Sequence, residues 1–331
     1  MQTLAEQIIE VGQWIWEKDL TSGASGNISA RVSDKEILIT GRGTCLGMLR
    51  KVDVCAINYD GQSLEKGFEP SSEKLFHTSV YKTLDAGAVV HVHPTFCNGY
   101  FAVHDRIEFD TFETRLTLGD IPVIGQKTPT ITDIAPVQEA LKRSNIVVLK
   151  NHGVVAIGET LKDAFFLVQT LEEAVKIACV RDLYAPKKAD GATEVLRANT
   201  PAKDEKKYAL FSEGQIKEIV RLVNSDDKFR QLALETRLET KLAVVMDETQ
   251  SIFCFHFSQG GIKDCTKETA DAEFVISGKA EYWRAIFNRQ LDPFAATTQK
   301  KLKLKGDFAK ISRWYVPFNR LFDLWTSVAV E

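Results

Sequence analysis

Residues 89–94 read Val89-Val90-His91-Val92-His93-Pro94, a short apolar run that carries two histidines. Side chains two positions apart on a β-strand project to the same face, so both imidazoles can approach one metal ion. Proline cannot donate to a sheet ladder, and it should end the strand just beyond them. We therefore expect a strand over Ala88–His93 with the histidines at its carboxyl end, which is where ligands usually bind in α/β folds.

A third histidine follows another β-type run. His152 stands in Lys150-Asn151-His152-Gly153, directly after the apolar residues of Ile146–Lys150. Three neutral imidazoles leave a fourth position open for water or substrate, which is typical of catalytic zinc, whereas structural zinc is normally closed by cysteines. An isolated His-x-His pair is more often ordinary packing. The interpretation therefore depends on the third histidine and on a nearby glutamate.

Glu73 is that glutamate. Pro70 disfavours a helix before it, and Ser71 or Ser72 can cap a helix that begins there. The apolar residues Phe76, Val80 and Leu84 then recur every four residues, as on one face of a helix. Glu73 is therefore expected one or two residues inside this helix. Carboxylates are common in first turns because they favour the positive end of the helix dipole. Simple capping and a catalytic role both remain open from these residues alone.

Length and composition limit the classes of protein. A chain of 331 residues exceeds the size of a typical single core, which favours two domains. No segment approaches the roughly 20 apolar residues of a membrane span, and a net charge of −3 offers no attraction for nucleic acid, so small molecules are the expected partners. Six scattered cysteines argue against a disulfide framework and favour a reducing cytoplasm. The pattern of Met1–Leu20 predicts an amphipathic helix and, because it has no basic start, not a signal peptide.

Two domains and a linker are predicted from the pattern along the chain. Residues 1–185 alternate helical periodicity with β-type runs, which predicts an α/β layered domain closed by a helix over Leu161–Tyr184. Residues 186–207 are rich in Pro, Gly, Asp and Lys and read as a linker. Residues 208–331 begin a second domain, in which Ser251–Ser258 alternates as a strand before a Gly260-Gly261 hairpin turn. The strands expected in the first domain are Glu36–Thr40, Ala88–His93, Ile121–Gly125, Ile146–Lys150 and Val154–Ile157.

Four separated motifs resemble the class II aldolase/adducin family over about residues 1–184: Gly26-Asn27-Ile28-Ser29, Ser71-Ser72-Glu73, His91-Val92-His93-Pro94 and Asn151-His152-Gly153. The resemblance implies a three-layer α/β/α domain, a homotetramer with sites at subunit contacts, and Zn²⁺ or another divalent metal on His91, His93 and His152. It implies a lyase that stabilises the enediolate of a small keto-sugar or keto-acid substrate, with Glu73 as the base. Its phosphate pocket corresponds to Gly26, Asn27, Thr40, Gly41, Ser71 and Ser72.

Two departures from that family pattern leave the reaction open. Arg42 stands where a proline is expected, and it can grip a carboxylate. Residues 107–113 lack the tyrosine that serves the aldolases as proton donor, which favours a decarboxylase, dehydratase or epimerase branch. A zinc hydrolase is a further alternative, because three histidines, water and a glutamate could equally attack an ester or amide.

Residues from about Phe229 to Ala329 resemble the sterol carrier protein type-2 family, through Asp271–Gly278, Leu291-Asp292-Pro293 and Leu302–Phe308. The resemblance implies a smaller α+β domain, a mainly antiparallel five-stranded sheet with helices over one face and a tunnel for a lipid or acyl ligand. A lipid carrier with a scaffolding aldolase-like half is therefore the alternative of another class.

Three further features of the sequence receive structural interpretations. Residues 308–328 predict a helix that is apolar almost all round and kinked at Pro317. The alternating lysines Lys301, Lys303 and Lys305 are interpreted as the solvated face of an edge strand rather than as a surface that binds a membrane. His77, His104 and His256 are interpreted as structural, the first two without partners.

Overall fold

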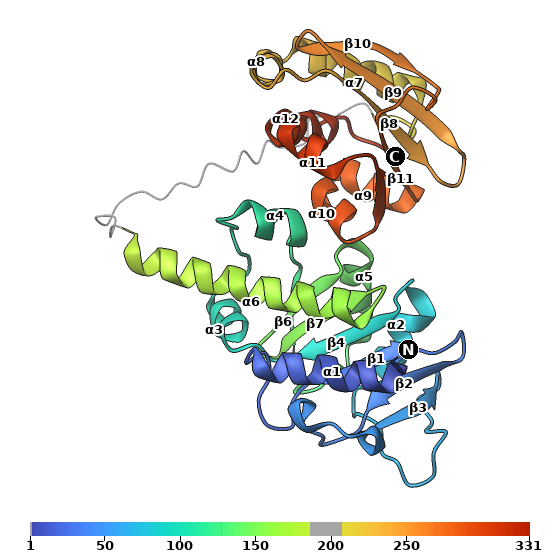
Figure 1. Ribbon diagram of the computed structural model, residues 1–331, viewed down its shortest axis with the longest axis vertical. Helices are drawn as coiled ribbons and strands as arrows, with labels where there is room; N and C mark the ends of the chain where they lie inside the picture. The colour runs from blue at the N-terminus through green and yellow to red at the C-terminus, as the bar shows by residue number, and fades with distance from the viewer. Residues whose placement is uncertain (1, 127, 186–206) are drawn as a thin grey trace. The chain divides into compact units, whose positions relative to one another are not determined.

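The computed structural model describes residues 2–126, 128–185 and 207–331, and the chain divides after residue 186 into two compact units (Figure 1). The predicted linker over 186–207 lies, except for its last residue, outside the described residues. Among the described helices, none is long and apolar enough to cross a membrane.

A seven-stranded sheet forms the centre of the first unit. Its order is β3 (Val54–Asn58), β2 (Glu36–Thr40), β1 (Asn27–Arg31), β4 (Ala88–Val92), β7 (Gly153–Gly158), β6 (Ile146–Lys150) and β5 (Val123–Gly125). Every neighbouring pair is antiparallel except β5 and β6. The strands β1 and β3 were not among those predicted from the sequence. Polar residues interrupt the apolar run in β1, whereas β3 is apolar up to Asn58 and shows no alternation.

Helices cover both faces of this sheet. On one face pack α1 (Leu4–Glu17), α3 (Thr95–Val103), α4 (Phe112–Leu118) and α6 (Leu161–Tyr184), against alternate strand residues such as Val90 and Val92 (Figure 1). On the other face pack α2 (Lys74–Thr83) and α5 (Ile134–Arg143), against the intervening residues such as Val89 and Val155. Period-two alternation thus gives each face its own core, and the predicted mixed α/β class is confirmed.

The predicted helix start near Ser71 needs correction. Helix α2 begins at Lys74, and Glu73 is its N-cap residue, so Glu73 does not lie inside the first turn. Its side chain makes no capping bond, and the Ser71 hydroxyl instead accepts from the Glu73 amide at 3.2 Å. The carboxylate is therefore available for contacts across the sheet end. The helix over Leu161–Tyr184 begins and ends as predicted, with Thr160 and Asp163 forming a capping box.

The second unit contains a five-stranded sheet with helices, as the α+β prediction requires. The order is β10 (Gly261–Thr266), β9 (Ser251–Ser258), β8 (Thr240–Met246), β11 (Phe274–Gly278) and β12 (Leu302–Lys305), antiparallel except between β8 and β11. The helices are α7 (Glu213–Ser225), α8 (Asp227–Glu235), α9 (Ala280–Phe287), α10 (Pro293–Thr298), α11 (Phe308–Ile311) and α12 (Tyr315–Trp325). Aromatic side chains fill its core.

Three local predictions in this unit were wrong. The hairpin turn is Gln259-Gly260, both with positive φ, and Gly261 already belongs to β10. The predicted helix over 308–328 is two helices joined by a 3₁₀ turn at Ser312–Trp314, and Pro317 lies in the first turn of α12, where its missing N–H removes no helical bond. Lys301 precedes the edge strand β12 and is buried, with its ammonium 5.3 Å from the centre of the Tyr282 ring.

Two of the histidines interpreted as structural lie away from the candidate site. His104 follows α3, and its ring contacts that of Tyr100 in a tilted arrangement with the centroids 4.2 Å apart, so the prediction that it has no partner was wrong. His256 on β9 lies 3.4 Å from the carboxylate of Asp264 on the neighbouring strand.

Candidate metal centre

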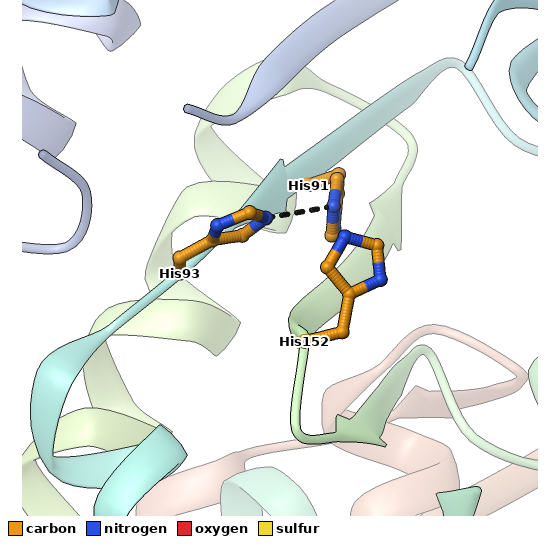
Figure 2. A group of neighbouring side chains, drawn as sticks. All are labelled: His91, His93 and His152. Carbon is orange, nitrogen blue, oxygen red and sulfur yellow. Dashed lines mark hydrogen bonds between the residues drawn. The ribbon is translucent and has the colours of Figure 1, made fainter. Parts of the chain in front are cut away.

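Three histidines converge at one end of the first sheet. His91 is the fourth residue of β4, His93 follows the end of that strand, and His152 lies in the turn between β6 and β7. Figure 2 shows the three imidazole rings turned toward one another from these two strand ends. Their nitrogens lie within 4.8 Å of one another, and Nε2 of His91 is 3.1 Å from Nε2 of His93.

These distances suit a single metal ion. Two nitrogens bound at about 2.05 Å to one tetrahedral zinc lie about 3.3 Å apart, close to the separation of the His91 and His93 atoms. The Nδ1 atom of His91 is 3.0 Å from the carbonyl oxygen of Val154, which fixes the proton on Nδ1 and directs the Nε2 lone pair into the cluster. Burial lowers the pKa of His93 to about 3 and that of His152 to about 4, and neutral imidazole is the form that binds metals.

The turn that carries His152 has two backbone requirements. Asn151 adopts a left-handed conformation with φ of 63°, which asparagine tolerates better than most residues. A Cβ at Gly153 would lie 2.4 Å from the carbonyl oxygen of Val92 and 2.6 Å from Cδ2 of His93. Glycine is therefore required at position 153 for the His152 turn to pack against the His93 strand end.

Helix α3 ties the two ligand-bearing segments together. It begins immediately after His93 and Pro94, and the side chain of Asn98 donates to the carbonyl oxygen of His152 at 3.3 Å. The buried carboxylate of Glu172 on α6 accepts the amides of Phe96 and Cys97, at 3.1 and 2.9 Å, at the start of α3. Glu172 thus anchors the segment that follows a metal-ligand candidate.

The Glu73 carboxylate faces the histidine cluster. Its Oε2 lies 3.3 Å from Nε2 of His91 and its Oε1 lies 3.9 Å from Nε2 of His152. Asn27 donates its side-chain amide to Oε2, and the backbone amide of Ile131 donates to Oε1, both at 2.9 Å. Burial by itself would raise the pKa of Glu73, but His91 and these two donors outweigh it and lower the pKa to about 2. The carboxylate is therefore ionised at neutral pH.

A pocket of about 140 Å³ opens beside the cluster. Five of the six residues expected to bind phosphate line it together with Glu73, His93 and His152: Gly26, Asn27, Gly41, Ser71 and Ser72. Thr40, the sixth, lies behind the wall, where its buried hydroxyl accepts from the amide of Ile28 at 3.2 Å. Arg42 also lines the pocket, and its guanidinium pairs with Glu69 at 2.6 Å in an exposed ion pair.

Several residues around this site were missed in the sequence. Pro129 and Thr130 line the pocket and Ile131 holds Glu73, but their segment has no motif of its own. Glu172 did carry a signal, because a carboxylate between the apolar residues Leu171 and Val175 must find a partner when it is buried. The buried histidine His77, interpreted as structural and without partners, does have partners, which are described below.

Residues 6–179 match the family model of the class II aldolase and adducin N-terminal domain, and residues 216–314 match that of the SCP-2 sterol transfer family. The first match covers more than half of the chain. This chain belongs to the class II aldolase and adducin family. The predicted family and the fusion to a sterol-carrier domain are both confirmed.

Relatives and solved structures of the class II aldolases match the first unit over most of their own length. An L-fuculose phosphate aldolase of Methanocaldococcus jannaschii is 32% identical over 174 residues, 52% of this chain and 93% of the relative. A 3-oxo-tetronate 4-phosphate decarboxylase of Haemophilus influenzae is 32% identical over 181 residues, 52% of this chain and 85% of the relative. The crystal structure of an L-fuculose-1-phosphate aldolase from Thermus thermophilus superposes with a TM-score of 0.51 at 29% identity, covering 57% of this chain and 98% of that one. These relatives indicate an enzyme.

Proposed function

We propose that the first unit is a zinc-dependent lyase that acts on a small keto-sugar or keto-acid substrate, with Glu73 as its base. The observation that carries the proposal is the convergence of three imidazole nitrogens and one ionised carboxylate at the wall of a single pocket. Family membership supports the same class of chemistry.

Each group in the site has a role that its position supports. His91, His93 and His152 would hold the ion, which supplies a Lewis acid that polarises a substrate carbonyl. Glu73 accepts a carbon-bound proton, because its two oxygens face the cluster while Asn27 and Ile131 hold them in place. Ser71 and Ser72 lie before the start of α2 at the pocket wall, where hydroxyls and the helix end favour a phosphate or carboxylate.

Decarboxylation is the second candidate reaction. Residues 107–113 contain no tyrosine, and the H. influenzae relative is named a decarboxylase of a phosphorylated 3-oxo acid. Arg42 on the pocket wall could bind a substrate carboxylate once it is released from Glu69. Product analysis separates the candidates, because decarboxylation releases carbon dioxide whereas aldol cleavage yields an aldehyde and a ketone.

Metal content and proton exchange test the proposal. The purified protein should carry about one zinc per chain, and chelation should abolish exchange of a carbon-bound proton of dihydroxyacetone phosphate with deuterated water. Glu73→Gln should keep the metal and slow this exchange by roughly 10³-fold, since the amide cannot accept the proton. Glu65→Gln, an exposed glutamate of the same unit, serves as the control.

Exchange at the wild-type rate in Glu73→Gln would overturn the assignment of the base. A zinc hydrolase would show a different pattern, because ester or amide hydrolysis requires no exchange at carbon. Metal-free protein with full activity would exclude the lyase as proposed.

We propose further that the second unit binds a lipid or acyl ligand. Its family supports this class of ligand, and two donors in its core, Nε2 of Gln215 and Nε1 of Trp325, are buried with no acceptor among the described residues. A carbonyl or carboxylate oxygen of a ligand could accept from them. Native mass spectrometry of the freshly purified protein should detect a bound lipid, and its absence after expression in a lipid-rich host would contradict the proposal.

The homotetramer is also proposed rather than observed. Helices α3 and α4 each contact α6, and the three helices expose the apolar side chains of Val103, Phe112, Leu183 and Tyr184. A second copy of the chain could cover them. Native mass spectrometry should show four chains, and replacement of Leu183 and Tyr184 by glutamate should shift the mass toward smaller species. A monomer at micromolar concentration would contradict the assembly.

A further inference from the structure

A row of buried polar side chains lies between the sheet and helix α2, behind Glu73. Strand β1 contributes Asn27 and Ser29, two positions apart and therefore on one face. Helix α2 and its N-cap contribute Glu73, His77 and Tyr81, four positions apart and therefore on one stripe. All five are buried, and the ring of His77 has no exposed surface.

These side chains form one chain of hydrogen bonds. The Tyr81 hydroxyl lies 2.8 Å from Oγ of Ser29, which lies 2.6 Å from Nδ1 of His77. Nε2 of His77 lies 2.5 Å from Oδ1 of Asn27. The amide nitrogen of Asn27 then donates to Oε2 of Glu73 at 2.9 Å.

The direction of every donor follows from the carboxylate end. An ionised carboxylate can only accept, so Asn27 must present its NH₂ group to Glu73 and its oxygen to His77. His77 must then carry its proton on Nε2, which leaves Nδ1 to accept from the Ser29 hydroxyl. Ser29 in turn accepts from Tyr81. Burial lowers the pKa of His77 to about 3, in keeping with a neutral ring.

We propose that His77 is a positioning residue for Glu73, and that its Nε2–H locks the Asn27 amide in the orientation that donates to the catalytic carboxylate. Without this donor the amide could turn over about its Cβ–Cγ bond and bring its oxygen against Oε2, which two acceptors would disfavour. With it, Oε2 keeps one lone pair occupied by Asn27 and directs another toward His91 and the pocket. The inference rests on the proposed role of Glu73 as the base.

Two substitutions of His77 distinguish positioning from packing. His77→Phe keeps a ring of similar size but removes both bonds, whereas His77→Gln has an amide that can donate to Asn27. In the zinc-loaded full chain, His77→Phe should slow deuterium exchange into dihydroxyacetone phosphate by about 10- to 100-fold, with bound zinc and KM little changed. His77→Gln should recover the rate to within a few-fold of wild type. Thr78→Val, a buried substitution on the same helix outside the row, is the control.

The tautomer of His77 provides a readout that requires no substrate. Two-bond ¹H–¹⁵N correlation of the zinc-loaded protein labelled at histidine should show His77 neutral and protonated on Nε2, assigned by the signal lost in His77→Gln. A proton on Nδ1, or a charged ring near pH 7, would overturn the inference even if His77→Phe fails to fold.

The two proposals fail in different ways. Wild-type exchange in Glu73→Gln would show that Glu73 is not the base, and the row of hydrogen bonds would then have no catalytic group to position. Slow exchange in Glu73→Gln combined with wild-type exchange in His77→Phe, or with equal losses in His77→Phe and His77→Gln, would overturn the role of His77 alone.

Discussion

The cores of the two units differ in the kinds of side chain that they bury together. In the first unit, asparagine, serine, histidine and glutamate side chains are buried together near the strand ends, and they contact one another. In the second unit, the sheet packs mainly against phenylalanine and tryptophan. Each unit also has buried polar atoms without a partner among the described residues: Nδ1 of His152 in the first, and Nε2 of Gln215 and Nε1 of Trp325 in the second. The buried polar groups of the first unit therefore lie at the candidate site, whereas the second core is stabilised mainly by apolar burial.

The largest effect is expected from the loss of one of the three proposed metal ligands. His152→Ala leaves two imidazoles and should lower zinc occupancy and proton-exchange activity by roughly 10⁴-fold, because a site with two ligands holds zinc weakly. Metal analysis and exchange kinetics measure both quantities. His104→Ala, at an exposed histidine outside the cluster, should leave them unchanged. Full zinc content in His152→Ala would contradict the contrast between the two units, since the buried polar side chains of the first unit would then serve packing alone.

The matching substitution in the second unit should lower stability without changing zinc binding. Trp325 is almost fully buried, with its ring 5.3 Å from Phe255 and 5.4 Å from Phe322. Trp325→Ala should cost about 4 kcal/mol of unfolding free energy through the cavity that it leaves. Urea unfolding measures this, and zinc binding should not change. Leu234→Ala, at an exposed residue of the same unit, should stay within about 0.5 kcal/mol of wild type.

A smaller loss of stability, joined to a loss of metal affinity, is expected at Glu172. Glu172→Ala leaves the amides of Phe96 and Cys97 at the start of α3 without their acceptor, which should cost about 2 to 3 kcal/mol. Because α3 follows His93, zinc affinity should also fall by about 10-fold. Glu172→Gln keeps one oxygen and should lose less. The adjacent and exposed Glu173→Ala is the matched control, and an equal loss there would remove the special role of Glu172.

The smallest effect is expected at a partly buried ion pair in the second unit. Asp226 caps α8 and pairs with Arg320 at 2.5 Å, and the hydrogen bond from Arg320 lowers its pKa in spite of partial burial. A lowered pKa in the folded state stabilises the protein above the unfolded value of about 4, and this contribution is lost as the pH falls through the folded value. Asp226→Asn should therefore cost about 1 kcal/mol at pH 7 and progressively less as the pH falls below about 4 toward the folded value. Urea titrations over a series of pH values check it, and a constant difference would contradict the assignment.

The sequence predicted the elements that have simple periodicity. The amphipathic stripe gave the bounds of α6, and the His-x-His strand end predicted where two candidate ligands lie. It could not predict the order of the strands, and so it could not show that Asn27 pairs with His91 across β1 and β4. The polar stripe of Glu73, His77 and Tyr81 was visible at four-residue spacing, but its meaning depends on β1, which was not predicted. Backbone contacts such as Ile131 to Glu73 have no signature in residue types.

The pairing of β4 with β7 has a consequence for biosynthesis. Val92 lies opposite Val154, so the turn bearing His152 approaches His91 and His93 only after a strand from much later in the chain has joined the sheet. A growing polypeptide that has left the ribosome only as far as α5 can offer an ion two imidazoles but not three. The set of three imidazoles can therefore be complete only after translation has passed His152, so the proposed metal centre forms late in the synthesis of the first unit.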